Sequence, residues 1–220
     1  MNLIIDFDST ICKLEGLDEL ATIVQKNNWD KNISEEIEEI TNLGMSGQIN
    51  FEESLTRRLK LLEFDKNDLD ELIKVLKLNL TSSFIEKAAE LLKISDNFFV
   101  ISGGFLDFIY PVLEDFEIKK ENIFANEFIF NENGKFVKHN RDNPLAHPGG
   151  KITVVDNLVK SGSNIVVGDG FPDHEIKISG AADYFIAFVG NQKRDNVVEN
   201  ADYVCNNFDE VLEVLKKINQ

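Results

Sequence analysis

The sequence is poor in cysteine, in basic residues and in long apolar runs. Its 220 residues include two cysteines, Cys12 and Cys205, which excludes a disulfide framework and a cysteine-rich metal site. Both are expected to be buried, reduced thiols. Lysine and arginine number 23 against 39 acidic residues, a formal net charge of −16. Such a chain repels a polyanion at long range, so we expect no nucleic-acid partner.

Long hydrophobic stretches are also missing. No apolar run comes near the roughly 20 residues that are needed to cross a bilayer. The first ten residues already hold two aspartates, where a secretory signal would be apolar. We therefore expect no membrane partner and a cytoplasmic protein. The length suits one substantial domain, or one domain that carries a modest insertion.

The sequence shows two kinds of hydrophobic pattern. Residues 3–7 are short, branched and apolar, which is typical of a buried strand. Residues 14–79 are charged and amphipathic and predict about four helices with no strand among them. From about residue 83 helices alternate with short apolar strands, a pattern that favours a parallel sheet covered on both faces. The fold class is therefore α/β, with a helical insertion after the first strand.

A different local signal lies at "IFANEFIFNENGKFVKHN". Two short β-type runs are joined there by Asn133-Gly134, a pair typical of a tight hairpin turn. The sequence predicts a β-hairpin over about residues 123–140.

Polar residues gather where the predicted strands end. The first strand runs into "DFDST" (Asp6, Asp8), a second into Ser102-Gly103-Gly104, and a later one into Gly168-Asp169-Gly170, with Asp173 close behind and Lys151 following a glycine pair. In open parallel sheets ligands collect at the carboxyl ends of the strands. The sequence thus predicts one site built from carboxylates, a hydroxyl, glycines and a lysine.

These residue types suit phosphoryl chemistry. Asp6, Asp8 and Asp169 offer hard oxygen ligands of the kind that Mg²⁺ prefers. Ser102, nearby backbone N–H groups and Lys151 could hold phosphoryl oxygens, and Gly103 and Gly104 let the backbone approach closely. A carboxylate nucleophile would form an aspartyl-phosphate, which divides a difficult hydrolysis into two easier steps.

The strings "DFDST", "SGG", Lys151 and "GDGFPD", in that order, resemble the four motifs of the haloacid dehalogenase superfamily. The resemblance covers the whole chain. It implies a Rossmann-like three-layer α/β/α core of residues 1–13 and 80–220, and a helical cap of residues 14–79 that closes over the site. It further implies that Asp6 is the nucleophile and Asp8 the general acid and base. Mg²⁺ would be bound by Asp6, the Asp8 backbone carbonyl and Asp169, with support from Asp173, while Ser102, Gly103 and Lys151 bind phosphate.

Other strings resemble the phosphoserine phosphatase branch of that superfamily, among them "DFDSTICKLEGLDELA" and "MSGQINFEESLTRRLKLL". The likeness implies a role in serine biosynthesis. It places Glu15 against a substrate ammonium, Arg58 against a substrate carboxylate, and Met45, Phe51 and Gly104 along the substrate. One anion and one guanidinium are what an amino acid requires.

Three features depart from that pattern. Pro172 stands before the last Asp of the last motif, where many relatives have Asn or Thr, and the bulky Phe171 precedes it. Arg57 lies beside Arg58 and competes for the same role, although the matching frame favours Arg58. His147 stands close to Lys151 without an assigned function.

Three functions therefore stay open. The first is a Mg²⁺-dependent phosphomonoesterase that acts on O-phospho-L-serine. The second keeps the chemistry but takes another small phosphomonoester, sugar-like or from methionine salvage. The third is a non-catalytic phosphate-binding or partner-binding module. A monomer and a homodimer fit the sequence equally well.

Overall fold

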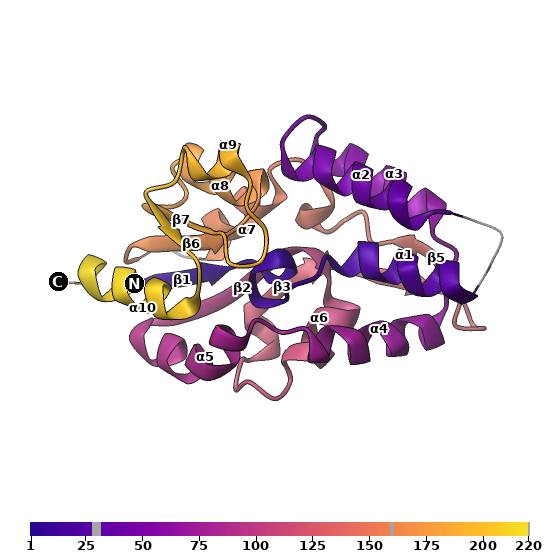
Figure 1. The fold of residues 1–220 in the computed structure, drawn as a ribbon, viewed down its shortest axis with the longest axis horizontal. Coiled ribbons are helices and arrows are strands. Elements are labelled where there is room, and N and C mark those ends of the chain that lie inside the picture. The colour runs from indigo at the N-terminus through magenta and orange to yellow at the C-terminus, as the bar shows by residue number, and fades with distance from the viewer. Residues whose placement is uncertain (28–31, 159–160, 220) are drawn as a thin grey trace.

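A six-stranded parallel sheet forms the centre of the protein (Figure 1). The computed structural model describes residues 1–27, 32–158 and 161–219. The strands are β1 (Asn2–Ile5), β2 (Asn97–Phe105), β3 (Ile123–Asn126), β6 (Asn164–Gly168), β7 (Tyr184–Phe188) and β8 (Tyr203–Cys205). Their order across the sheet is β3-β2-β1-β6-β7-β8. The α/β fold with a parallel sheet is therefore confirmed.

The strands are apolar on both faces because helices cover both. Along β1, Leu3 and Ile5 enter one hydrophobic cluster and Ile4 enters another, as the two-residue period of a strand requires. The first cluster includes residues of α5 (Ser82–Ile94), α6 (Leu106–Leu113) and α10 (Phe208–Ile218). The second includes residues of α7 (Gly150–Leu158), α8 (Phe171–Ile178) and α9 (Asp195–Val198). The result is a three-layer core.

Among the described residues, four α-helices lie between β1 and α5 and make up most of the right-hand half of the molecule in Figure 1. They are α1 (Gly16–Asn27), α2 (Ser34–Met45), α3 (Phe51–Leu61) and α4 (Lys66–Leu78). Asn50 and Asp65 are the N-cap residues of α3 and α4, and their side chains accept hydrogen bonds from backbone N–H groups in the first turn of each helix. The predicted insertion at 14–79 also contains residues 28–31, which lie outside the described residues.

The two connections between these helices and the sheet run side by side. The Lys13 N–H donates to the Asn79 carbonyl at 2.9 Å, and the Thr81 N–H donates to the Ile11 carbonyl at 2.9 Å. We call helices α1–α4 the cap and this pair of connections the hinge. In the part of the chain that the structure describes, no helix combines the length and the apolarity needed to span a membrane.

The hairpin is shorter than the sequence predicts. Residues 123–126 form β3, which pairs in parallel with β2 and extends the main sheet. The prediction is wrong for this segment because Ile123 and Ala125 are buried against the core. The hairpin itself consists of β4 (Phe128–Phe130) and β5 (Phe136–His139). It packs on Phe64 of the cap, whose ring stacks on that of Phe136 at 4.6 Å.

Candidate active site

The chain leaves β1 through a tight turn that places two carboxylates. The Asp6 N–H still donates to Val167 of β6 at 2.9 Å, so Asp6 is held at the end of the sheet. Its carboxylate accepts a hydrogen bond from the Phe7 N–H at 2.8 Å. The turn η1 (Phe7–Ile11) then reverses the chain, with Ser9 in the left-handed region at φ 52°. This strained turn is what brings Asp8 back toward the site.

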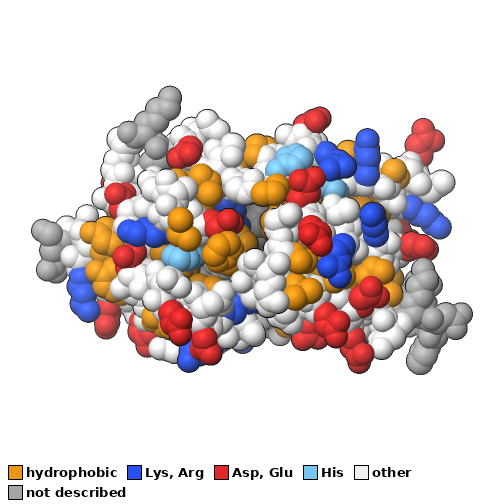
Figure 2. Space-filling view, turned by 90° about the horizontal axis from the view of Figure 1, so that it is seen from above, with side chains coloured by type: hydrophobic (Ala, Val, Ile, Leu, Met, Phe, Trp, Pro, Cys, Tyr) orange, Lys and Arg blue, Asp and Glu red, His pale blue; other side chains and the backbone are white. Residues whose placement is uncertain are grey.

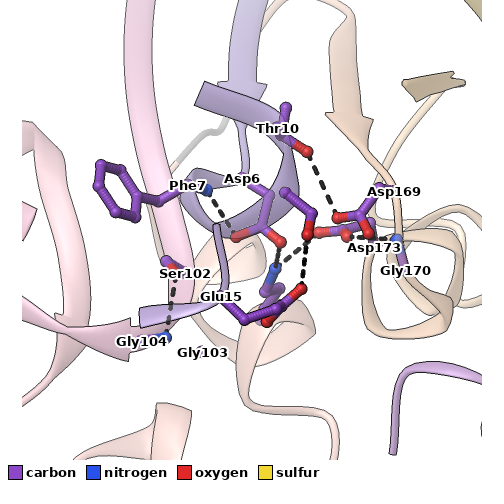
Figure 3. Close-up of polar contacts among 12 residues, drawn as sticks. Asp6, Phe7, Thr10, Glu15, Ser102, Gly103, Gly104, Asp169, Gly170 and Asp173 are labelled. Carbon is purple, nitrogen blue, oxygen red and sulfur yellow. Dashed lines mark hydrogen bonds and ion pairs between the residues drawn. The ribbon is translucent and has the colours of Figure 1, made fainter. Parts of the chain in front are cut away.

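Three carboxylates converge beyond the ends of β1 and β6 (Figure 3). Oxygens of Asp6, Asp169 and Asp173 all lie within 4.8 Å of one another, and each residue is at most 3% exposed. The Lys151 ammonium lies 2.9 Å from Asp6 Oδ2 and 2.6 Å from Asp173 Oδ1. Burial and the Asp6 charge raise the pKa of Asp173 to about 7 despite that lysine. Lys151 therefore offsets only part of the negative charge of the three carboxylates.

This donor set fits a divalent metal. Buried carboxylates of like charge are costly unless a cation compensates them, and Mg²⁺ is bound by a few carboxylates together with water and phosphate oxygens. Asp6 and Asp169 were predicted as ligands, and Asp173 as their support. The Asp8 carboxylate does not join the cluster, so its part in the metal site would rest on the predicted backbone carbonyl.

Asp8 points instead toward the cap. Its Oδ1 accepts a hydrogen bond from the Gly16 N–H at 2.7 Å, at the start of α1. Burial, followed by the charges of Glu15 and Asp6, raises the pKa of Asp8 well above its ordinary value. A carboxyl group that retains its proton closer to neutral pH is suited to act as a general acid. Asp6 and Asp8 thus differ in partner and in electrostatic setting.

The β2 end supplies the predicted phosphate-binding segment. Ser102 Oγ accepts a hydrogen bond from the Gly104 N–H at 2.9 Å. A Cβ at Gly104 would lie 2.7 Å from Asp8 Oδ2, and one at Gly103 would lie 2.6 Å from the Phe51 ring. A side chain at either position would therefore displace Asp8 or Phe51, and the phenyl ring of the cap rests on the core at Gly103.

One buried cavity joins these groups. It has a volume of about 30 Å³, room for about two water molecules. Its lining is Asp6, Asp8, Glu15, Leu17, Met45, Phe51, Arg58, Ser102, Gly103, Gly104, Lys151, Pro172 and Asp173. All the predicted site residues except Asp169 thus line a single cavity, and Asp169 belongs to the adjoining carboxylate cluster.

The charged cavity residues Arg58 and Glu15 have restricted surroundings. Arg58 is 6% exposed, whereas the Arg57 side chain is 45% exposed and pairs with Glu53. The geometry therefore favours Arg58 as the residue that faces the cavity. Glu15 accepts a hydrogen bond from the Ser9 hydroxyl at 2.7 Å. An acidic and a basic side chain reach the same small space.

The departures from the family pattern lie where the cap meets the core. Pro172 lines the cavity. Phe171 contacts the cap at Gly47, where a Cβ would come within 3.0 Å of its ring. On another side, Glu52 of α3 is 2.8 Å from Arg141 and 3.5 Å from His147. We call this group of three residues the Glu52 clasp.

Two residues of the site were missed by sequence reasoning. Arg194 follows β7 and forms ion pairs with Asp169 and with Glu15. The Asn191 side chain donates to the carbonyls of Ser9 and Thr10 at 3.2 and 3.1 Å, which braces the turn after β1. Their place in the chain could have identified them, because both residues follow a predicted parallel strand, and the ends of such strands meet at one edge of the sheet.

Comparisons by sequence and by structure both find phosphoserine phosphatases among the similar proteins. The human phosphoserine phosphatase is 33% identical over 216 residues, which cover 96% of this chain and 92% of that protein. A crystal structure of a phosphoserine phosphohydrolase-like protein from Francisella tularensis superposes with a TM-score of 0.89, at 32% identity over 97% of this chain and 98% of the other.

A structure titled as a phospho-aspartyl intermediate analogue of phosphoserine phosphatase has a TM-score of 0.80 and 26% identity, over 96% of this chain and 97% of its own. A scan against protein-family models found no match. The family assignment therefore rests on these relatives, which match this chain over nearly the whole length of both proteins. The chain belongs to the phosphoserine phosphatase family of the haloacid dehalogenase superfamily.

Proposed function

We propose that this protein hydrolyses O-phospho-L-serine to L-serine and phosphate. One observation carries the proposal: a single cavity joins the Asp6–Asp8 pair and Lys151 of the core to Glu15 and Arg58. The core groups suit transfer of a phosphoryl group, and the other two suit the ammonium and carboxylate of an amino acid. The names of the relatives point to the same substrate.

In the first step, a carboxylate oxygen of Asp6 attacks phosphorus and the bond from phosphorus to the serine oxygen breaks. Asp8 gives its proton to that departing oxygen, for which its raised pKa prepares it. In the second step, water attacks phosphorus, Asp8 takes a proton from the water, and the bond to Asp6 breaks. Both carboxylates return to their starting state, and phosphate leaves.

The other core residues stabilise charge on the phosphoryl group. Lys151 lies 2.9 Å from Asp6, so its ammonium can offset the repulsion between that carboxylate and the incoming dianion. Burial alone would lower the pKa of Lys151, but Asp173 and Asp6 together raise it, so the side chain stays charged. The Ser102 hydroxyl and the backbone N–H of Gly103 are the proposed hydrogen-bond donors to phosphoryl oxygens.

Asp6, Asp169 and Asp173 would hold a Mg²⁺ ion. When bound, the ion supplies positive charge that polarises the phosphoryl oxygens. Its binding can be measured apart from activity. Millimolar Mg²⁺ should raise the thermal unfolding temperature by several degrees, since a ligand at about 100 times its Kd stabilises by about 2.7 kcal/mol. The shift should vanish in Asp169→Asn, and an equal shift in that variant would place the metal elsewhere.

A cavity of about 30 Å³ is too small for phosphoserine. The cap must therefore move to admit the substrate and then close again, which excludes water and commits the bound ester to reaction. The cap can pivot on the core at the hinge, because the two connecting segments lie side by side there.

The deciding experiment is phosphate release over a panel of phosphomonoesters with Mg²⁺, with and without EDTA. The panel holds L- and D-phosphoserine, phosphothreonine, sugar phosphates and nucleotides. We expect kcat/KM to be highest for L-phosphoserine and activity to disappear with EDTA. Metal-dependent release that favours another ester would keep the reaction and discard the substrate. An absence of release from every ester would leave a binding module. The cytoplasmic location stays a prediction for cell fractionation.

A further inference from the structure

We propose that Asp18 and Thr41 are positioning residues that aim the Arg58 guanidinium at the substrate carboxylate. The inference rests on the proposed function, because it assumes a substrate that carries a carboxylate. Asp18 lies on α1, Thr41 on α2 and Arg58 on α3. One chain of contacts therefore joins three helices of the cap.

Arg58 is buried, and no carboxylate of a described residue forms an ion pair with its guanidinium. Its Nε donates to the Ser54 carbonyl at 3.4 Å, and its Nη1 donates to the Thr41 hydroxyl at 3.3 Å. A guanidinium carries further N–H donors in a rigid fork. Because Arg58 lines the cavity, those remaining donors are available to an oxyanion there.

The Thr41 hydroxyl both donates and accepts a hydrogen bond, and this fixes its role toward Arg58. The residue is 2% exposed, and its hydroxyl donates to Asp18 Oδ1 at 2.5 Å. A hydroxyl has a single proton to donate and lone pairs to accept with. Once the proton is committed to Asp18, a lone pair is left for the Arg58 N–H. Threonine therefore relays the negative charge of Asp18 to the guanidinium.

The spacer also explains why Asp18 does not pair with Arg58 directly. A carboxylate in contact with the guanidinium would occupy the bidentate face that the substrate needs. A hydroxyl between them keeps the compensating charge near and leaves that face free. Asp18 is also close to Glu15, Glu38 and Arg58, and burial together with Glu15 raises its pKa to about 7. The relay is therefore complete only when Asp18 is ionised.

The test compares two substrates on Thr41→Val. O-phospho-L-serine and O-phosphoethanolamine share the phosphate and the ammonium, and only the first carries a carboxylate. We expect Thr41→Val to lose about tenfold in kcat/KM for phosphoserine, mostly through KM, which is the loss expected for one hydrogen bond to a charged group. Phosphoethanolamine should be turned over as by the parent. The ratio of the two cancels any inactive fraction in a preparation.

Two further variants sharpen the result. Thr41→Ser keeps the hydroxyl and should restore the ratio to within about twofold of the parent. Thr22→Val is the matched control, because Thr22 lies on α1 and its exposed hydroxyl donates to the Asp18 backbone carbonyl at 3.2 Å. It should leave the ratio unchanged. If Thr41→Val does not fold, Thr41→Ala is read by the same ratio.

The possible failures are distinct. A parent enzyme with no preference for phosphoserine over phosphoethanolamine would overturn the proposed function, and this inference with it. A parent that prefers phosphoserine, together with a Thr41→Val variant of unchanged ratio, would overturn the inference alone. Equal losses on both substrates would also overturn it, since they would indicate a purely structural role.

Discussion

The core half and the cap half of the site are held in different ways. In the core, Asp6 and Asp169 directly follow β1 and β6, Ser102 lies within β2, and β1 pairs with both of the other strands. Backbone hydrogen bonds of the sheet therefore set their spacing. In the cap, Arg58 is held by the Ser54 carbonyl of its own helix and by the Thr41 hydroxyl of α2. Chemistry thus depends on the sheet, and recognition depends on how three helices pack.

The largest effect should come from the core. Asp6→Asn removes the proposed nucleophile, and we expect kcat to fall by more than about 10⁴-fold, as losses of covalent nucleophiles do. Phosphate release from phosphoserine measures it, with the unfolding temperature as the check on folding. Substantial remaining activity would mean that the catalysis measured does not depend on this carboxylate, and the division between the halves would then fail.

The cap should affect selectivity more than chemistry. Arg58→Met removes the guanidinium and keeps an apolar stem, so KM for phosphoserine should rise about 100-fold with kcat changed far less. Arg57→Met is the matched control, because Arg57 is exposed and pairs with Glu53. Steady-state kinetics on both variants decide between the neighbouring arginines. A larger effect from Arg57→Met would reverse the assignment.

Stability should respond to pH through the cap. The pKa of Asp18 rises from 3.8 to about 7 on folding, because burial and the nearby Glu15 disfavour its charge. A raised carboxyl pKa means that the folded state favours the proton. Its contribution to stability is therefore present at acid pH and is lost as pH rises toward 7, by about 2 kcal/mol between pH 5 and 8. Asp18→Asn should lack this loss, as urea unfolding at several pH values would show.

The smallest effect should come from the Glu52 clasp. Glu52→Gln should raise KM less than about fivefold, as expected for exposed ion pairs. The contact with the Arg141 carbonyl, followed by Glu52, raises the pKa of His147. The clasp is therefore strongest with His147 protonated, and the penalty of Glu52→Gln should be larger at pH 6 than at pH 8. Glu53→Gln, one position along and paired with Arg57, should match the parent at both pH values.

The sequence anticipates most of the core half because its signals are local. Asp6 and Asp169 each follow a short apolar strand directly, and the parallel sheet brings such ends together. Arg194 escaped because it lies several residues beyond β7 in a polar loop, where nothing local distinguishes it from Lys193. The hairpin was placed too early because alternation alone does not reveal that β3 pairs with β2. The Asp18–Thr41–Arg58 relay depends on helix packing, which no local pattern of residues encodes.

The hinge contains a thiol, Cys12, whose chemical labelling can report how often the hinge opens. Cys12 is fully buried there, and its Sγ lies 3.5 Å from the Asn79 carbonyl. Burial raises the pKa of Cys12 to about 12, so a thiol reagent should modify it only while the hinge is open. Cys205, buried in β8 of the sheet, provides an internal reference for opening of the core. The ratio of the two labelling rates would report how often the cap lifts during turnover, without an engineered labelling site.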